Sequence, residues 1–301
     1  MRSRRRSEPL VSAKASEDRA GVGDVSKSNC RANNSKIMIN IISRKFKDQL
    51  LSLLYYFGGL FAYAWMIMAI FPTMKTADLA TVYDQFPEEF LKFFGANGIE
   101  NMGTIEGFMS LEFLSLFFIL IITFYIGSSA GSTIAGAIEK RTMDFQLSQP
   151  ISRTKIAVSE TLVGLFNTFL LVALTVLSIY LLGKVYNVSL NNQGLITFGF
   201  VATIFLWAFY GVAILLSSLL KNKLTVAALT VGILMGLYVL NAMTKIVEKL
   251  AKYEKFTLFN MYDPQKLLTN EAINWYHILV LALILIIGIV CSLIIFNKKD
   301  I

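Results

Sequence analysis

Six long apolar runs constrain this chain more than any other feature of its 301 residues. A transmembrane helix needs about 20 consecutive, mostly apolar residues, and each run approaches or exceeds that length. The runs lack the strict alternation of barrel strands, so helices are the form in which they can cross a bilayer. We place the spans at roughly residues 50–71, 111–130, 156–182, 195–220, 224–240 and 275–296. The sequence therefore predicts an all-α, polytopic integral membrane protein with about six transmembrane helices.

The overall composition agrees with this fold class and argues against binding of nucleic acid. Hydrophobic residues make up 55% of the chain and charged residues 16%, with a mean hydropathy of +0.60. The net charge of +8 could indicate a nucleic-acid partner. Most positive charges, however, either crowd a polar N-terminal tail or flank the apolar runs, as in the cytoplasmic loops of membrane proteins. We expect the lipid bilayer, and no nucleic acid, as a partner.

Residues 1–37 form a polar tail, rich in Ser, Arg, Ala and Gly, without apolar periodicity. Such a composition predicts disorder, since it cannot bury enough apolar surface to offset the cost of ordering. The tail favours Arg, whereas the remainder favours Lys and has only Arg44, Arg141 and Arg153. We expect the tail to be an upstream extension and residues 38–301 to form the functional transmembrane domain.

The distribution of Lys and Arg over the loops predicts the orientation of the chain. The loops expected in the cytoplasm carry clusters around Arg44, Lys140, Lys221 and Lys298. The first external loop, about residues 72–108, is mainly acidic, which fits the positive-inside rule. The last external loop fits less well, because it holds several lysines. We expect a multi-pass protein of a bacterial plasma membrane, with both termini in the cytoplasm.

Sequence signatures of several enzyme classes are missing from the chain. It has no Gly-x-x-x-x-Gly-Lys-Ser/Thr phosphate loop, so it should not bind ATP in that way by itself. It has no His-Glu-x-x-His or Cys-x-x-Cys pattern, and its two cysteines and single histidine suggest no metal cluster. We therefore expect a protein that is not an enzyme and that holds neither a metal nor a cofactor.

Small residues four apart recur in three of the spans. Because such residues share one helix face, they let the backbone of a neighbouring helix approach closely. Each pair is predicted to serve helix packing within the chain or, as the alternative, a dimer interface. The pairs are Gly58 and Ala62, Gly127 and Gly131, and Gly232 and Gly236.

Residues 131–153 form a short charged segment between two long apolar spans. Within it, Ile138–Ser148 has apolar residues at helical spacing and can form a short helix. Pro150 would stop this helix, because proline lacks an N–H and disfavours helical geometry in the residue before it. Arg153 then precedes the next span. We expect a soluble partner to act on the membrane domain at this segment.

The segment and its surroundings resemble the permease subunits of ABC-2-type transporters. The matching residues are Gly136, Glu139, Thr142 and the run Leu147-Ser-Gln-Pro-Ile-Ser-Arg153, which corresponds to the cytoplasmic coupling helix of that family. The resemblance runs from about Met38 to the end of the chain. It departs from the family pattern at Arg141, where many members have Gly, and at Gln146, where many have Leu.

This resemblance implies a partner and a role for the matched segment. Two permease subunits would pair, as a homodimer or heterodimer, and each would seat its coupling helix in a groove of a separate ATPase subunit. ATP and Mg would be bound by that partner, and ATP binding would switch the membrane pathway toward export. The residues expected to couple the chain to the ATPase are Glu139, Arg141, Thr142, Phe145, Leu147, Pro150 and Arg153.

Two other functions stay open at this point. One is a membrane sensor or immunity component that binds a ligand without moving it. The other is an ion-driven secondary transporter, for which Glu112 and Glu160, near the ends of predicted spans, are the candidate proton carriers. The scarcity of acidic residues in the middle of the spans disfavours the second alternative.

Overall fold

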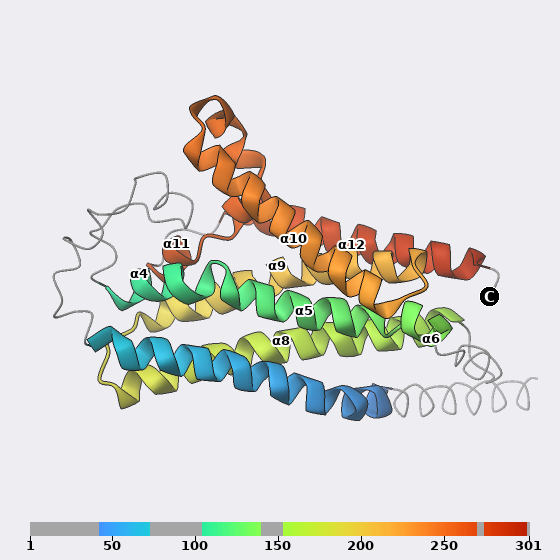
Figure 1. Cartoon of the computed structure of the whole chain (residues 1–301), viewed down its shortest axis with the longest axis horizontal. Coiled ribbons are helices and arrows are strands. Elements are labelled where there is room, and N and C mark those ends of the chain that lie inside the picture. The colour runs from blue at the N-terminus through green and yellow to red at the C-terminus, as the bar shows by residue number, and fades with distance from the viewer. Residues whose placement is uncertain (1–41, 73–103, 140–152, 270–273, 300–301) are drawn as a thin grey trace, which may run out of the picture.

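The computed structural model describes residues 42–72, 104–139, 153–269 and 274–299. These ranges contain six helices long and apolar enough to cross a membrane: Ile42–Pro72, Ile105–Gly131, Thr154–Val185, Asn192–Leu219, Lys223–Ile246 and Trp275–Lys298. The helices form one bundle (Figure 1). Each predicted span falls on one of them, so the prediction of an all-α, multi-pass membrane protein is confirmed. The predicted tail lies outside the described residues.

The second span begins earlier than the apolar run predicts. It consists of α4 (Ile105–Met109), a π-helical turn η2 (Ser110–Leu114) and α5 (Phe117–Gly131). The hydroxyl of Thr104 caps α4 by accepting a hydrogen bond from the N–H of Gly107 at 3.2 Å. A polar start capped in this way adds a turn of helix that hydrophobicity alone does not indicate.

Three of the later spans begin where a short polar side chain satisfies their first N–H groups. Asn191, Asn222 and Asn274 cap α9, α10 and α12, each through its side-chain oxygen. The elements after α5 are α6 (Ala135–Glu139), α8 (Arg153–Val185), α9 (Asn192–Leu219), α10 (Lys223–Ile246), the 3₁₀ helices η3 (Glu248–Phe256) and η4 (Leu258–Met261), α11 (Pro264–Leu268) and α12 (Trp275–Lys298).

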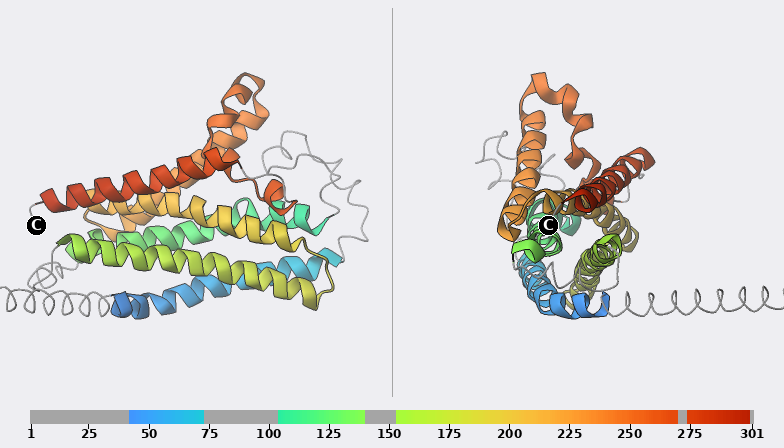
Figure 2. Two further views of the ribbon diagram at one scale, coloured as in Figure 1. Left: turned by 180° about the vertical axis from the view of Figure 1, so that it is seen from behind. Right: turned by 90° about the vertical axis from the view of Figure 1, so that its right-hand side faces the viewer.

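The two ends of the bundle carry different short elements. The α6 end holds α6, the turn between α9 and α10, and the last turn of α12, whereas the α11 end holds α4 and α11 (Figures 1 and 2). Of the short helix predicted over Ile138–Ser148, the described residues include only Ile138 and Glu139, which end α6, and the rest of that prediction lies outside them.

Helix α9 occupies the middle of the bundle and packs against α5, α8, α10 and α12. Toward the α11 end it joins a group of rings that we call the aromatic cluster. In this cluster Phe205 stacks on Tyr262 with ring centroids 4.8 Å apart, and Phe259 lies 5.4 Å from Tyr238 of α10. Such pairs add about 0.5–1.5 kcal/mol each beyond the burial of their area. The cluster comprises Phe118, Phe198, Phe205, Tyr238, Phe259 and Tyr262.

Candidate coupling site at the α6 end

The start of helix α6 is attached to α9 through the hydroxyl group of Ser217. The first N–H groups of a helix have no partner inside that helix and need one from elsewhere. At α6 the Oγ of Ser217, on α9, accepts hydrogen bonds from the N–H of Ala135 at 3.1 Å and of Ile134 at 3.4 Å. Ser217 is fully buried, so this cap is shielded from water. The start of α6 is therefore fixed to the central helix of the bundle.

The end of α6 is attached to a different helix, α10. The carboxylate of Glu139 accepts a hydrogen bond from the backbone N–H of Lys223, the first residue of α10, at 2.9 Å. Asn222 accepts from the next two N–H groups, so the two side chains share the donors at this helix start. A carboxylate is favoured there because the N-terminus of a helix carries partial positive charge. Glu139 thereby links α6 to α10 directly.

Two of the predicted packing glycines lie at the contact between α5 and α10. A Cβ added at Gly127 would come within 2.8 Å of the Cα of Ala227, and one added at Gly131 within 2.9 Å of the carbonyl oxygen of Lys223. No side chain fits at such distances, so the two backbones meet here. The contact holds α10 against the helix that leads into α6.

The other small residues do not face a neighbouring helix of the same chain. Gly58, Gly232 and Gly236 are exposed, and within the described ranges no atom of another helix lies within 4 Å of a Cβ added at any of them. Ala62 is exposed as well. The contribution of these residues to a dimer interface therefore stays a prediction.

Most of the predicted coupling residues lie outside the described part of the chain. They are Arg141, Thr142, Phe145, Leu147 and Pro150. Arg153 is described as the first residue of α8, by its backbone only. Of the seven residues, Glu139 is thus the one whose side-chain contacts can be assigned.

A buried polar group, missed by the sequence analysis, lies beside this site. The ammonium group of Lys45 contacts the carboxylate of Glu160 at 3.1 Å and the hydroxyl of Ser132, just before α6, at 3.4 Å. One turn farther along the first helix, the carboxamide oxygen of Gln49 accepts from Asn167 at 2.8 Å. Lys45 and Gln49 share one helix face because they are four residues apart, which is the signal that could have revealed them.

The structure corrects the expected exposure of Glu160. This residue was placed near a span end, where water would reach it, but it is only 7% exposed. Its charge is balanced by Lys45, so a structural ion pair accounts for a carboxylate at this depth. Asn167, inside the third span, donates an interhelical hydrogen bond to Gln49.

The C-terminal end of α12 joins the same end of the bundle. Lys299 donates a hydrogen bond to the carbonyl oxygen of Ser218 at 2.9 Å, next to the residue that caps α6. Burial, together with the nearby Lys221 ammonium group, lowers the pKa of Lys299. The α6 end therefore brings together residues from α6, α9, α10 and α12.

One motif beside this site has the spacing of a catalytic turn. The segment Gly127-Ser-Ser-Ala-Gly131 has the Gly-x-Ser-x-Gly spacing of a hydrolase nucleophile turn, which the sequence analysis overlooked. It lies within helix α5, however, and Ser129 donates its hydrogen bond to Gln49 at 3.2 Å. Among the residues that the structure describes, no group of three or more His, Cys, Asp or Glu side chains could hold a metal ion.

Comparison with known protein families agrees with this arrangement. The family model described as ABC-2 family transporter protein matches residues 39–301, which include all six membrane-spanning helices and the α6 end. No curated protein matches the chain. Domains of this family are membrane components of transporters and are not catalytic. The chain belongs to the ABC-2 family of transporter proteins.

Proposed function

We propose that the chain is the permease subunit of an ATP-driven exporter and that its α6 end couples it to a separate ATPase subunit. Membership of the family implies an ABC ATPase as partner. The observation that carries the proposal is the double attachment of α6, to α9 through Ser217 and to α10 through Glu139. A force that the ATPase applies to α6 would reach two membrane-spanning helices through these hydrogen bonds.

In this proposal the α6 end faces the cytoplasm and the partner supplies the chemistry. Basic residues flank the spans at this end, among them Lys155, Lys221 and Lys298, which fits the positive-inside rule. ATP and Mg are bound by the ATPase subunit, since this chain has no phosphate loop. Both termini then lie in the cytoplasm of a bacterial cell, with the α11 end outside.

The aromatic cluster would transmit a shift of α10 relative to α9 to the α11 end of the bundle. Tyr238 of α10 packs against Phe259, and Phe259 lies 5.3 Å from Phe205 of α9. A shift of α10 relative to α9 would therefore separate or close these rings. Nucleotide binding can drive the shift only if it favours one of the two arrangements over the other. Separation of the rings would open the pathway outward, as export requires.

The proposal predicts that the chain, tagged and purified from its own cells, copurifies with an ATPase subunit. It also predicts that Glu139→Ala breaks the coupling between the two subunits. In a Cys30→Ser, Cys291→Ser background, thiol labelling of Leu258→Cys would report on the aromatic cluster. Labelling should change at least about fivefold when the ATPase binds ATP, because allosteric coupling is typically of that size. Glu139→Ala should remove this dependence, since it deletes the acceptor for Lys223.

Glu139→Gln is the matched control, because its side-chain oxygen can still accept the same hydrogen bond. It should keep most of the nucleotide dependence. Loss of the cap alone costs about 1 kcal/mol, so Glu139→Ala should still insert and fold. The proposed function would be contradicted if ATP changed the labelling of Glu139→Ala as much as that of the parent protein. It would also be contradicted if the chain were purified without any ATPase.

The exposed glycines of α10 predict a second property, pairing of two permease subunits. Gly232→Leu and Gly236→Leu fit the single chain, since the surroundings of both positions are open. In a dimer that packs along this helix face they would force the two backbones apart. We expect each variant to lower cross-linking between subunits while leaving the amount of folded protein unchanged. Gly59→Leu, equally open within the chain, is the control, and equal cross-linking in all variants would argue against this interface.

A further inference from the structure

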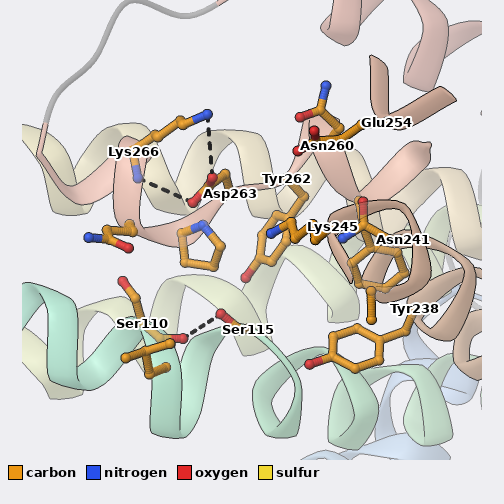
Figure 3. Close-up of a pocket in the computed structure, with 15 residues that line it drawn as sticks. Ser110, Ser115, Tyr238, Asn241, Lys245, Glu254, Asn260, Tyr262, Asp263 and Lys266 are labelled. Atoms are coloured by element: carbon orange, nitrogen blue, oxygen red, sulfur yellow. Dashed lines mark hydrogen bonds and ion pairs between the residues drawn. The ribbon is translucent and has the colours of Figure 1, made fainter. Parts of the chain in front are cut away.

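A polar cavity of about 60 Å³ lies at the α11 end, opposite the coupling site. Figure 3 shows that its lining comes from segments far apart in the sequence: the π-helical turn η2, the last turns of α10, and the chain between η3 and α11. The aromatic rings of Tyr238, Phe259 and Tyr262 also border it. The polar lining residues used below are Ser110, Asn241, Lys245, Glu254, Asp263 and Lys266.

Ser110 presents a hydroxyl group to this cavity without a partner in the protein. The residue is 2% exposed, and its Oγ makes no hydrogen bond. Burying an unsatisfied hydroxyl costs about 1–3 kcal/mol, so such a group points to something that it binds. Ser110 is also the first residue of η2, and π-helical turns of this kind occur frequently at functional sites.

Two opposite charges line the same cavity and do not pair with each other. In the part of the chain that the structure describes, neither Lys245 nor Glu254 forms an ion pair. Their neighbours differ in this respect, because Lys266 lies 3.7 Å from the carboxylate of Asp263 (Figure 3). Among the described residues, the cavity therefore offers a cationic group, an anionic group and a hydroxyl group that have no partner in an ion pair or a side-chain hydrogen bond.

The rest of the wall is fixed. The carboxamide of Asn241 is held at one end by the hydroxyl of Thr257, at 2.6 Å, and its residue is 7% exposed. Tyr262 donates its hydroxyl proton to the carbonyl oxygen of Leu114, in η2, at 3.0 Å. The bond ties η2 to the segment that closes the other side of the cavity. The space is thus a preformed site whose shape does not depend on the two free charges.

We propose that this cavity binds a small zwitterionic group that carries a primary ammonium and a phosphate or carboxylate a few bonds apart. Lys245 and Ser110 bind the anionic part, and Glu254 binds the ammonium. Since a water-sized group needs about 10–15 Å³, the cavity holds roughly four to six such groups, which is the size of glycine and takes in only part of the larger phosphoethanolamine. A lipid headgroup and a free zwitterion share this chemistry. Binding does not depend on the ATPase coupling proposed above.

The test is a titration of the purified full-length protein with phosphoethanolamine, read by calorimetry. Phosphoethanolamine should bind, and phosphocholine should bind about tenfold or more weakly, because its quaternary ammonium cannot donate a hydrogen bond to Glu254. Lys245→Met and Glu254→Gln should each weaken binding about tenfold or more, as expected for charge-assisted contacts. Ser110→Ala should weaken it about fivefold. Lys266→Met, which removes a lysine already paired, should change it less than about twofold.

Further ligands separate the possible sources of the headgroup. Free glycine carries a carboxylate in place of the phosphate. Its binding would show that the cavity accepts small free zwitterions. In nanodiscs of phosphatidylethanolamine a lipid occupant should block phosphoethanolamine, whereas in phosphatidylcholine nanodiscs binding should persist. Inorganic phosphate that binds as tightly as phosphoethanolamine would overturn the zwitterion proposal. So would an absence of binding by phosphoethanolamine and glycine in detergent, or wild-type affinity in both Lys245→Met and Glu254→Gln.

Discussion

Gly288→Ala should destabilise the protein, although alanine is the better helix former. In α12 a Cβ at this position would lie 2.5 Å from the carbonyl carbon of Gly211 and 2.9 Å from its Cα. The reciprocal Cβ at Gly211 would lie 2.8 Å from the Cα of Leu285. Both neighbours are backbone and cannot rotate away, so α9 and α12 would have to separate. One turn along, Ser292 donates to the carbonyl oxygen of Ile214 at 3.0 Å, a bond that the same separation would weaken.

The sign of the effect makes this prediction informative. Replacing glycine by alanine inside a helix is worth about 1 kcal/mol in favour of the helix. Overpacking a tight contact costs about 1–3 kcal/mol and sometimes more, so we expect a net loss at Gly288. Gly59→Ala is the control, because nothing lies within 4 Å of its added Cβ and it should be neutral or stabilising. Thermal unfolding of the purified variants in one detergent measures both, and equal midpoints would refute the contact.

The same contact shows what the sequence could and could not predict about packing. Gly288 and Ser292 have the four-residue spacing of the small pairs that were singled out, and the sequence analysis passed over them. Spacing identifies a helix face that permits close approach, but not the helix that lies against it. Gly127 and Gly131 turned out to face α10, whereas Gly232 has only open space beside it. The partner of a face depends on the arrangement of the bundle, which local pattern does not encode.

The six spans, in contrast, could be predicted because they depend on local composition. An apolar run of sufficient length has no alternative to a helix in lipid. At the coupling site, Glu139 was predicted through its resemblance to a family segment. Its partner, the N–H of Lys223, lies 84 residues away along the chain, and the other anchor, Ser217, lies 82 residues from Ala135, whose N–H it accepts from. The role of Ser217 could not be inferred, since serines near a span end are common and only the fold brings this one to α6.

Lys45→Met should destabilise the protein by about 3–5 kcal/mol, the usual cost of leaving one partner of a buried ion pair alone. The side chains of Lys45 and Glu160 are only 14% and 8% exposed, so water cannot replace the lost partner. Glu160→Gln should have a cost of the same order for the opposite reason, because it leaves the ammonium group unpaired. Lys47→Met, at the exposed lysine of the same helix, should stay within about 0.5 kcal/mol of the wild type.

The double variant Lys45→Met with Glu160→Gln decides whether the two residues act as a pair. Neutral groups of similar volume often replace a buried pair at little cost, so the double variant should be more stable than either single one. The interaction energy of the cycle should then be about 2 kcal/mol, whereas independent residues would give additive losses. Because Lys45 also contacts Ser132 at 3.4 Å, the pair holds the first helix beside the start of α6. A positive cycle would therefore show that the ion pair couples the first span to α8 beside the start of α6.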